Sequence, residues 1–199
     1  MTNVSDTSAI CRQLITVESE SPTSIRAVLA VYQNDGAGWV QTMENIPAVV
    51  GKHGIDAHKV EGDQKTPQGL YELGEAFGTS PAPEGTALPY RIVTEHDYWV
   101  DDPESDDYNR WVHYEGNASE RWKSFERLTD PLYTHAIIIK YNEDPVVKGK
   151  GSAIFLHRWK SGDTPTLGCV AVAYEHLVRL LGIIDPVKKP KINMTVSGQ

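Results

Sequence analysis

The sequence predicts a mostly β protein, built as a sandwich of mixed sheets with one clear helix near its C-terminal end. Short apolar runs of strand length recur along the chain, separated by turns rich in Gly, Pro, Asn and Asp. Residues 135–141 form a nearly continuous apolar run, as in a central strand covered on both faces. Residues 174–184 carry apolar residues at helical spacing.

The N-terminal half is expected to form a series of short strands. A polar turn that contains Pro22 separates the first two strands, and Asn34-Asp35-Gly36 is a strong hairpin signal before the third. We find no internal repeat and no low-complexity segment in the sequence. The expected strands are residues 13–17, 25–32, 39–43, 47–51 and 69–73.

Residues 79–134 break this pattern, and we expect them to be an insertion within a single domain that spans residues 1–199. Residues 79–89 are rich in Pro, Gly and Ala and suit a surface loop. Residues 98–113 are acidic and aromatic, and their length is typical of a functional lid, while the aromatic residues argue against disorder. Two interpretations stay open: an ordered flap over a cleft, or a loop that closes one end of the sandwich.

The C-terminal half is organised around a strand, a loop and a second strand. Residues 152–156 are expected to form a buried strand that ends at His157, and residues 170–172 form the next strand. The loop between them is rich in Gly, Pro, Ser and Thr, so it cannot continue a strand. Beyond these strands, Pro186 stops the expected helix, and a last strand follows at residues 191–196.

A cysteine acyl-transfer site is the strongest functional candidate. The strand–loop–strand arrangement would bring His157 and Cys169 together, and Gly168 lets the neighbouring amides turn toward one point. A thiol, an imidazole and convergent amides are the parts of such a site. Taken alone, however, a single cysteine among aliphatic residues is more often a small buried hydrophobe, and a histidine at a strand end is more often structural.

A family resemblance changes this balance, because the segment from His157 to Cys169 resembles the catalytic motif of the YkuD-type L,D-transpeptidases. In that family an upstream His precedes a Ser/Thr-His-Gly-Cys element, which here is Thr166-Leu167-Gly168-Cys169. Residues 61–71 (EGDQKTPQGLY) are similar to the family's Thr-Pro-x-Gly-aromatic motif, and residues 47–51 are similar to the strand before it. The likeness covers roughly residues 14–186, and the combination is far more specific than any one motif.

The resemblance implies roles for the motif residues. Cys169 would be the nucleophile and His157 the base, acting as a thiolate–imidazolium pair, while amides around Gly168 and Cys169 would hold the oxyanion. The candidate substrate-binding residues are Arg158, Thr166 and Trp99. Arg158 is chosen because a guanidinium fork matches the geometry of a substrate carboxylate, and Lys65 and Arg110 are further candidates for that contact.

Two departures from the family pattern bear on the acceptor of the reaction. The motif His before Gly-Cys is Leu167 here, and the polar residue two positions after the Cys is Ala171. The loop of residues 158–168 is also shorter than usual. These changes keep the nucleophile and its base, but they alter the side chains expected to meet an incoming amine.

The substrate that the resemblance implies is a peptidoglycan tetrapeptide stem ending in D-Ala. Release of the acyl-enzyme to water would make the protein an L,D-carboxypeptidase of muropeptide recycling, which is the function we favour. An exported L,D-transpeptidase that forms cross-links or attaches proteins to the wall is one alternative. A non-catalytic wall-binding module is an alternative of another class, although such a module has no need of His157, Gly168 and Cys169 together.

Composition argues against several other partners. A net charge of −8 disfavours nucleic acid and anionic membranes, and no apolar run approaches the roughly 20 residues of a membrane helix. The acidic cluster of residues 101–109 lacks the Gly and the bidentate Glu of an EF-hand loop. The histidines show no recognised zinc spacing. We therefore expect no metal and no cofactor.

The first residues of the sequence, MTNVSDTSAICRQ, have no basic start, no apolar region and no small-residue cleavage site. On this basis we expect a cytoplasmic location, whereas a trimmed chain of an exported protein would be periplasmic or bound to the cell wall. We expect Cys11 to be a buried or edge thiol without chemistry.

Overall fold

The structure is a computed structural model that describes residues 11–198, so the expectations about residues 1–10 lie outside the described residues. Within residues 11–198, no helix is both long enough and apolar enough to cross a membrane. Nine strands form the main sheet: β1 (Gln13–Ser19), β2 (Arg26–Asn34), β3 (Trp39–Val49), β6 (Gly69–Gly78), β7 (Tyr90–Ile92), β11 (Ala136–Ile139), β12 (Phe155–Arg158), β13 (Val170–Val172) and β14 (Lys191–Val196).

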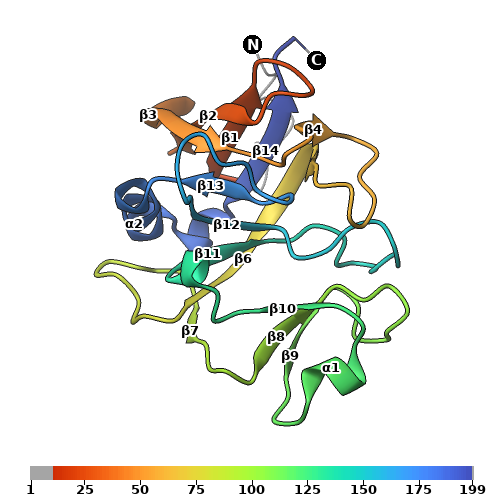
Figure 1. Cartoon of the computed structure of the whole chain (residues 1–199). Coiled ribbons are helices and arrows are strands. Elements are labelled where there is room, and N and C mark those ends of the chain that lie inside the picture. Colours follow the sequence, from red (N-terminus) through yellow and green to blue (C-terminus); the bar gives the residue numbers. More distant parts are fainter. Residues whose placement is uncertain (1–10, 199) are drawn as a thin grey trace.

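The main sheet is mixed and closes on itself (Figure 1). The strand order is β11-β12-β13-β3-β2-β1-β14-β6-β7, and β11 pairs with β6 as well as with β12, so that all strands except β7 form a closed ring. The pairs β1–β14, β12–β13 and β6–β7 are parallel, and the others are antiparallel. The prediction of a mostly β fold with mixed sheets is therefore confirmed.

Two of the expected strand boundaries were wrong for local reasons. Residues 39–43 and 47–51 were expected as separate strands, but β3 continues to Val49 because a bulge, with Asn45 at φ +54°, absorbs the irregular pairing with β2. The strand expected at 152–156 begins only at Phe155, since Ala153 has a φ of +53° that an extended strand does not allow. As a result, His157 lies within β12.

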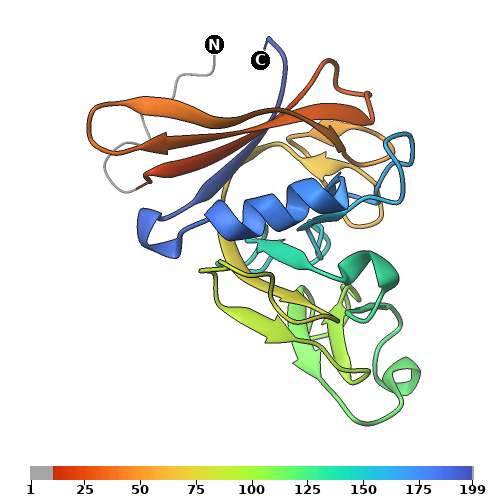
Figure 2. The same ribbon diagram turned by 90° about the vertical axis from the view of Figure 1, so that its left-hand side faces the viewer.

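Strands β11 and β12 are covered on both faces, which explains their continuous apolar sequences. Ile137, Ile139 and Leu156 belong to the main core, whereas Ala136, Ile138 and Phe155 belong to a second buried cluster on the opposite face. Helix α2 (Tyr174–Ile183) packs across the main sheet, where Leu177, Leu180 and Leu181 join the main core (Figure 2).

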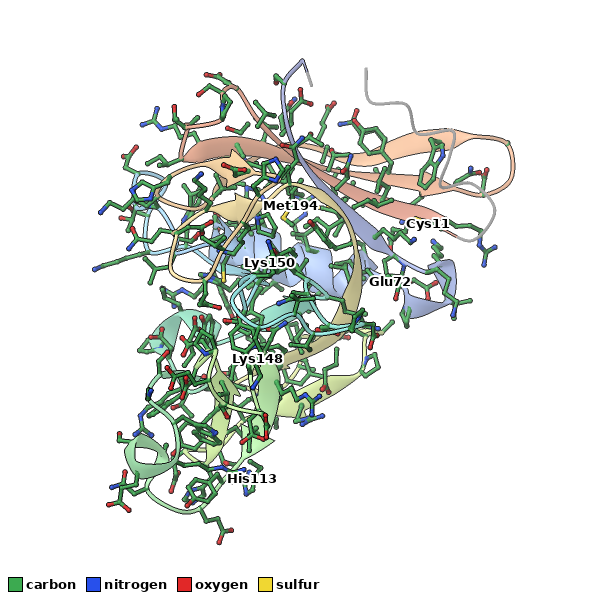
Figure 3. All side chains as sticks on the ribbon, turned by 90° about the vertical axis from the view of Figure 1, so that its right-hand side faces the viewer. Cys11, Glu72, His113, Lys148, Lys150 and Met194 are labelled. Carbon is green, nitrogen blue, oxygen red and sulfur yellow. The ribbon has the colours of Figure 1, made fainter. Side chains whose placement is uncertain are left out.

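The insertion forms a small sheet of its own below the main sheet (Figure 1). It consists of β8 (Asp97–Val100), β9 (Arg110–His113) and β10 (Phe125–Arg127) in the order β10-β8-β9, with the one-turn helix α1 (Ala118–Arg121). A third buried cluster, which includes Tyr98 and Trp122, packs against this sheet. In Figure 3, His113 lies toward the far end of the insertion, and Lys148 lies nearer to the main sheet. Lys148 also bonds Asp106 of the insertion at 3.1 Å.

Candidate active site

The pairing of β12 with β13 places the cysteine and the histidine on one face of the main sheet. These parallel strands align Leu156 with Val170 and His157 with Ala171. Leu156 and Val170 point into the main core, so alternation turns His157 and Ala171 to the opposite face. Cys169 precedes Ala171 by two residues and lies on that face as well, in the second buried cluster. His157 and Cys169 both line one cleft of about 790 Å³.

The thiol of Cys169 is free, buried and held by the backbone of the strand beside it. Its Sγ donates to the Ala153 carbonyl at 3.3 Å and accepts from the Phe155 N–H at 3.4 Å. Burial, and then the negative charge of Glu126, raise the pKa of Cys169 well above its usual range. The cysteine is therefore a neutral thiol at rest.

One hydrogen bond sets the tautomer of His157. Its Nδ1 lies 2.7 Å from the Arg158 carbonyl oxygen, and because a carbonyl only accepts, Nδ1 carries the proton. This leaves Nε2 as the basic nitrogen. Burial lowers the pKa of His157 to about 4, so the imidazole is neutral near pH 7. Burial thus favours a neutral thiol and a neutral imidazole in the resting site, and the thiolate–imidazolium pair stays a prediction.

Two threonine hydroxyls fix the backbone around the nucleophile. Thr166 Oγ1 accepts from the Gly168 N–H at 3.1 Å and donates to the Cys169 carbonyl at 2.6 Å. Thr66 Oγ1 donates to the Gly168 carbonyl at 2.7 Å. Gly168 has a φ of +149°, which favours glycine. The Gly168 N–H is already bonded to Thr166. Of the two amides expected to hold the oxyanion, the Cys169 N–H is therefore the candidate donor.

Thr66 comes from the Thr-Pro-x-Gly motif and connects this motif to the catalytic loop. It lies in β5 (Thr66–Pro67), which pairs in parallel with β4 (Ile55–Asp56), and its side chain is wholly buried. Its hydroxyl also accepts from the Gly51 N–H at 2.9 Å. The motif therefore fixes the backbone beside the nucleophile through the Thr66 hydroxyl. This role of Thr66 was not predicted from the sequence.

The insertion forms one wall of the cleft. Glu126 of β10 and Tyr133 of the 3-10 helix η2 (Pro131–Tyr133) both line the cleft. Tyr133 Oη donates to Glu126 Oε2 at 2.5 Å, and its ring meets the His157 ring edge-on at 5.3 Å between centroids. Burial raises the pKa of Glu126 to about 7, with smaller contributions from Asp101 and Asp130.

The predicted substrate-binding residues have different positions in the structure. Thr166 lines the cleft, but its hydroxyl is bonded within the catalytic loop. Arg158 and Trp99 are not among the lining residues: Arg158 contributes its carbonyl to His157, and buried Trp99 donates to Asn109 Oδ1 at 2.9 Å. The assignment of Arg158 and Trp99 to substrate binding stays a prediction. Charged residues that line the cleft and were not predicted are Lys59, Glu61, Asp101, Glu126, Arg127, Asp130 and Lys160.

Comparisons with known proteins agree with this arrangement. The family model for YkuD, the L,D-transpeptidase catalytic domain, matches residues 17–192. Two crystal structures of the helical cell shape determining protein Pgp2 from Campylobacter jejuni have similar folds. The structure of the K307A mutant of Pgp2 has a TM-score of 0.53 and 17% sequence identity. The match covers 94% of this chain and 48% of the Pgp2 chain. The other Pgp2 structure has a TM-score of 0.50 and 18% sequence identity, and the match covers 94% of this chain and 49% of the Pgp2 chain. The chain thus spans about half the length of these neighbours. No curated protein matches it.

Proposed function

Because the chain belongs to the YkuD family of L,D-transpeptidase catalytic domains, which act on peptidoglycan, we propose that it is an L,D-carboxypeptidase. Its substrate would be a tetrapeptide stem, free or within a muropeptide, from which it removes the terminal D-Ala. The proposal places this reaction in the recycling of muropeptides in the cytoplasm. The observation that carries the choice of water as acceptor is Leu167, which lines the cleft with 73% of its surface exposed.

Acylation starts from a neutral thiol and a neutral imidazole. Nε2 of His157 takes the Cys169 proton as sulfur attacks the carbonyl carbon of the L,D bond, so that the two charges form only during attack. The Cys169 N–H stabilises the negative oxygen of the tetrahedral intermediate. Collapse of that intermediate breaks the C–N bond, and the imidazolium returns its proton to the departing D-Ala amine. A thioester between Cys169 and the tripeptide remains.

Deacylation determines whether the enzyme hydrolyses or transfers. Leu167 contributes apolar surface to the cleft where a polar residue could accept a hydrogen bond from an incoming ammonium, and Ala171 lines the cleft but is wholly buried. An amine acceptor therefore gains no guiding contact from these positions. Water needs only Nε2 of His157, which takes its proton as the water oxygen attacks the thioester. Collapse of the resulting tetrahedral intermediate breaks the C–S bond, and the imidazolium returns the proton to the departing sulfur. The products are the tripeptide acid, which ionises to a carboxylate, and the regenerated thiol.

Incubation with a disaccharide-tetrapeptide in the presence of a second stem peptide tests this proposal by mass spectrometry of the products. We expect mainly the tripeptide and free D-Ala. A dominant cross-linked dimer, or efficient exchange of D-Ala for another D-amino acid, would instead identify a transpeptidase. Binding without turnover would indicate a wall-binding module. Fractionation of the source cells, with detection of the protein in each fraction, tests the compartment separately.

A further inference from the structure

Lys59 places a buried ammonium beside the catalytic loop, and the mechanism above does not use it. Its side chain is only 4% exposed, although it lines the cleft together with Cys169. Burial of an ammonium is costly unless a partner compensates. Nζ donates to Asp63 Oδ1 at 2.8 Å, the one hydrogen-bond acceptor it has among residues 11–198. A lysine ammonium has three donors, so two of them are left for groups that enter the cleft.

Gly151 leaves space for the Lys59 side chain, and Gly168 lies beside its ammonium. A Cβ on Gly151 would lie 2.7 Å from Lys59 Cε, and a Cβ on Gly168 would lie 3.5 Å from Lys59 Nζ. The first distance is a clash, so a side chain at position 151 would displace the lysine. Nζ therefore lies close to the residue that precedes the nucleophile, and the local backbone is shaped around it.

Asp63 holds the ammonium in position. Besides Lys59 it accepts from the Val60 N–H at 2.8 Å and from the Lys65 N–H at 2.9 Å. Burial alone would raise the pKa of Asp63, but these three bonds hold it below its usual range, so the carboxylate is ionised. The pair is held in place because Lys59 is buried, and Asp63, with 11% of its side chain exposed, is bonded to the backbone at Val60 and Lys65.

The charge of Glu126 disfavours a thiolate at Cys169, and a positive charge nearby offsets this effect. The groups that face Cys169 from the surrounding elements are His157, which is neutral near pH 7, and Tyr133 and Glu126. Asp130, Asp101 and Glu61 also line the cleft with carboxyl groups, and Arg127 and Lys160 line it with cations. Lys59 is the cation whose charge lowers the pKa of Cys169 and opposes the effect of Glu126.

We propose that Lys59 is a positioning residue whose buried ammonium provides the fixed positive charge that stabilises the thiolate of Cys169 during attack. The inference rests on Cys169 being the nucleophile, as proposed above. It is tested without any peptide, so it does not depend on the identity of the substrate.

The experiment measures the rate of alkylation of Cys169 by iodoacetamide, an uncharged reagent, from pH 6 to 10 in a Cys11→Ala background. Lys59→Met removes the charge, and we expect alkylation near neutral pH to slow by about tenfold or more, with the pH profile displaced to higher pH. Asp63→Asn leaves the ammonium without its neutralising partner, so alkylation should be as fast as in the parent protein or faster. Lys140→Met, which removes a surface lysine 3.6 Å from Glu72, is the matched control and should change nothing.

A double variant, Lys59→Met with Asp63→Asn, removes both buried charges together and guards against misfolding of the single variant. It should be alkylated as slowly as Lys59→Met. Two results would overturn the proposal. One is alkylation of Lys59→Met at the rate of the parent protein; if Lys59→Met does not fold, the same result for the double variant counts instead. If alkylation is unchanged and only peptide turnover is lost, Lys59 is assigned to substrate binding. The other is slowing by Asp63→Asn as large as that by Lys59→Met, because a purely structural pair would be damaged equally from either side.

Discussion

The hydroxyl of Thr66 donates to the carbonyl oxygen of Gly168 at 2.7 Å, across 102 residues of sequence. This bond joins the Thr-Pro-x-Gly motif to the residue that precedes the nucleophile. The same hydroxyl accepts from the Gly51 N–H, so it links three separate segments beneath the cleft. The position of Cys169 therefore depends on a residue that does not line the cleft.

Thr66→Val keeps the side-chain shape but removes the hydroxyl, leaving the buried Gly51 N–H and Gly168 carbonyl without their partner. We expect a loss of about 1–3 kcal/mol in the free energy of unfolding. We also expect turnover to fall by about tenfold or more, because the loop that carries Cys169 loses its support. Denaturant titration and steady-state kinetics measure the two effects. Thr195→Val, at a half-buried position on β14, serves as the control, and equal losses in both variants would argue against a special role for Thr66.

Cys169→Ala should abolish turnover while the protein stays folded. Few atoms are lost in this substitution, and the hydrogen bonds of the thiol are long. Circular dichroism checks the fold, and release of D-Ala measures activity. Cys11→Ala is the matched control: Cys11 is equally buried, but its thiol bonds Gln13 within the N-terminal strand region, so turnover should not change. Normal turnover by Cys169→Ala would refute the assignment of the nucleophile.

Leu167→His tests what determines the acceptor. The new imidazole would stand at the exposed mouth of the cleft and could accept a hydrogen bond from an acceptor ammonium. We expect the ratio of exchange to hydrolysis to rise relative to the parent protein, measured by mass spectrometry with a D-amino acid in excess. Leu167→Met, which preserves the apolar character, should keep the parent ratio. If the two variants give the same ratio, position 167 does not guide the acceptor.

The raised pKa of Glu126 predicts that the stability of the protein depends on pH. Burial raises its pKa to about 7 from an unperturbed value of 4.5, so folding favours the protonated form. The resulting stabilisation is fully present below pH 4.5 and is lost as the pH rises through 7. The difference between the melting temperatures of the parent protein and of Glu126→Gln should therefore shift against the parent protein as the pH rises from 5 to 8. A constant difference across this range would mean that Glu126 ionises normally in the folded protein.

Strand pattern and motif spacing were enough to predict much of the fold. The bounds of β13 and β14 were predicted correctly, because both strands are short apolar or alternating runs bounded by turns. The start of β12 was missed, since nothing in the identity of Ala153 announces a positive φ. The sheet of the insertion was also missed, because its short strands depend on packing among Tyr98, Trp122 and Phe125.

The site was only partly predictable for a related reason. Spacing and family resemblance pointed to His157 and Cys169, which the structure brings to one cleft. The contact between the Arg158 carbonyl and His157 could not be predicted from the identity of Arg158, because any residue at that position supplies a carbonyl. The roles of Thr66 and Lys59 arise from contacts between segments far apart in sequence, and local patterns do not reveal such contacts.

The most direct test of the proposed mechanism is the mass of the enzyme quenched in acid during turnover of a tetrapeptide. We expect a fraction of the protein to carry the tripeptide as a thioester, and peptide mapping should place it on the fragment that contains Cys169. When the tetrapeptide is exhausted, the adduct should disappear as free tripeptide accumulates. Release of D-Ala with no adduct at any quench time, or with an adduct on another residue, would contradict catalysis through an acyl-enzyme at Cys169.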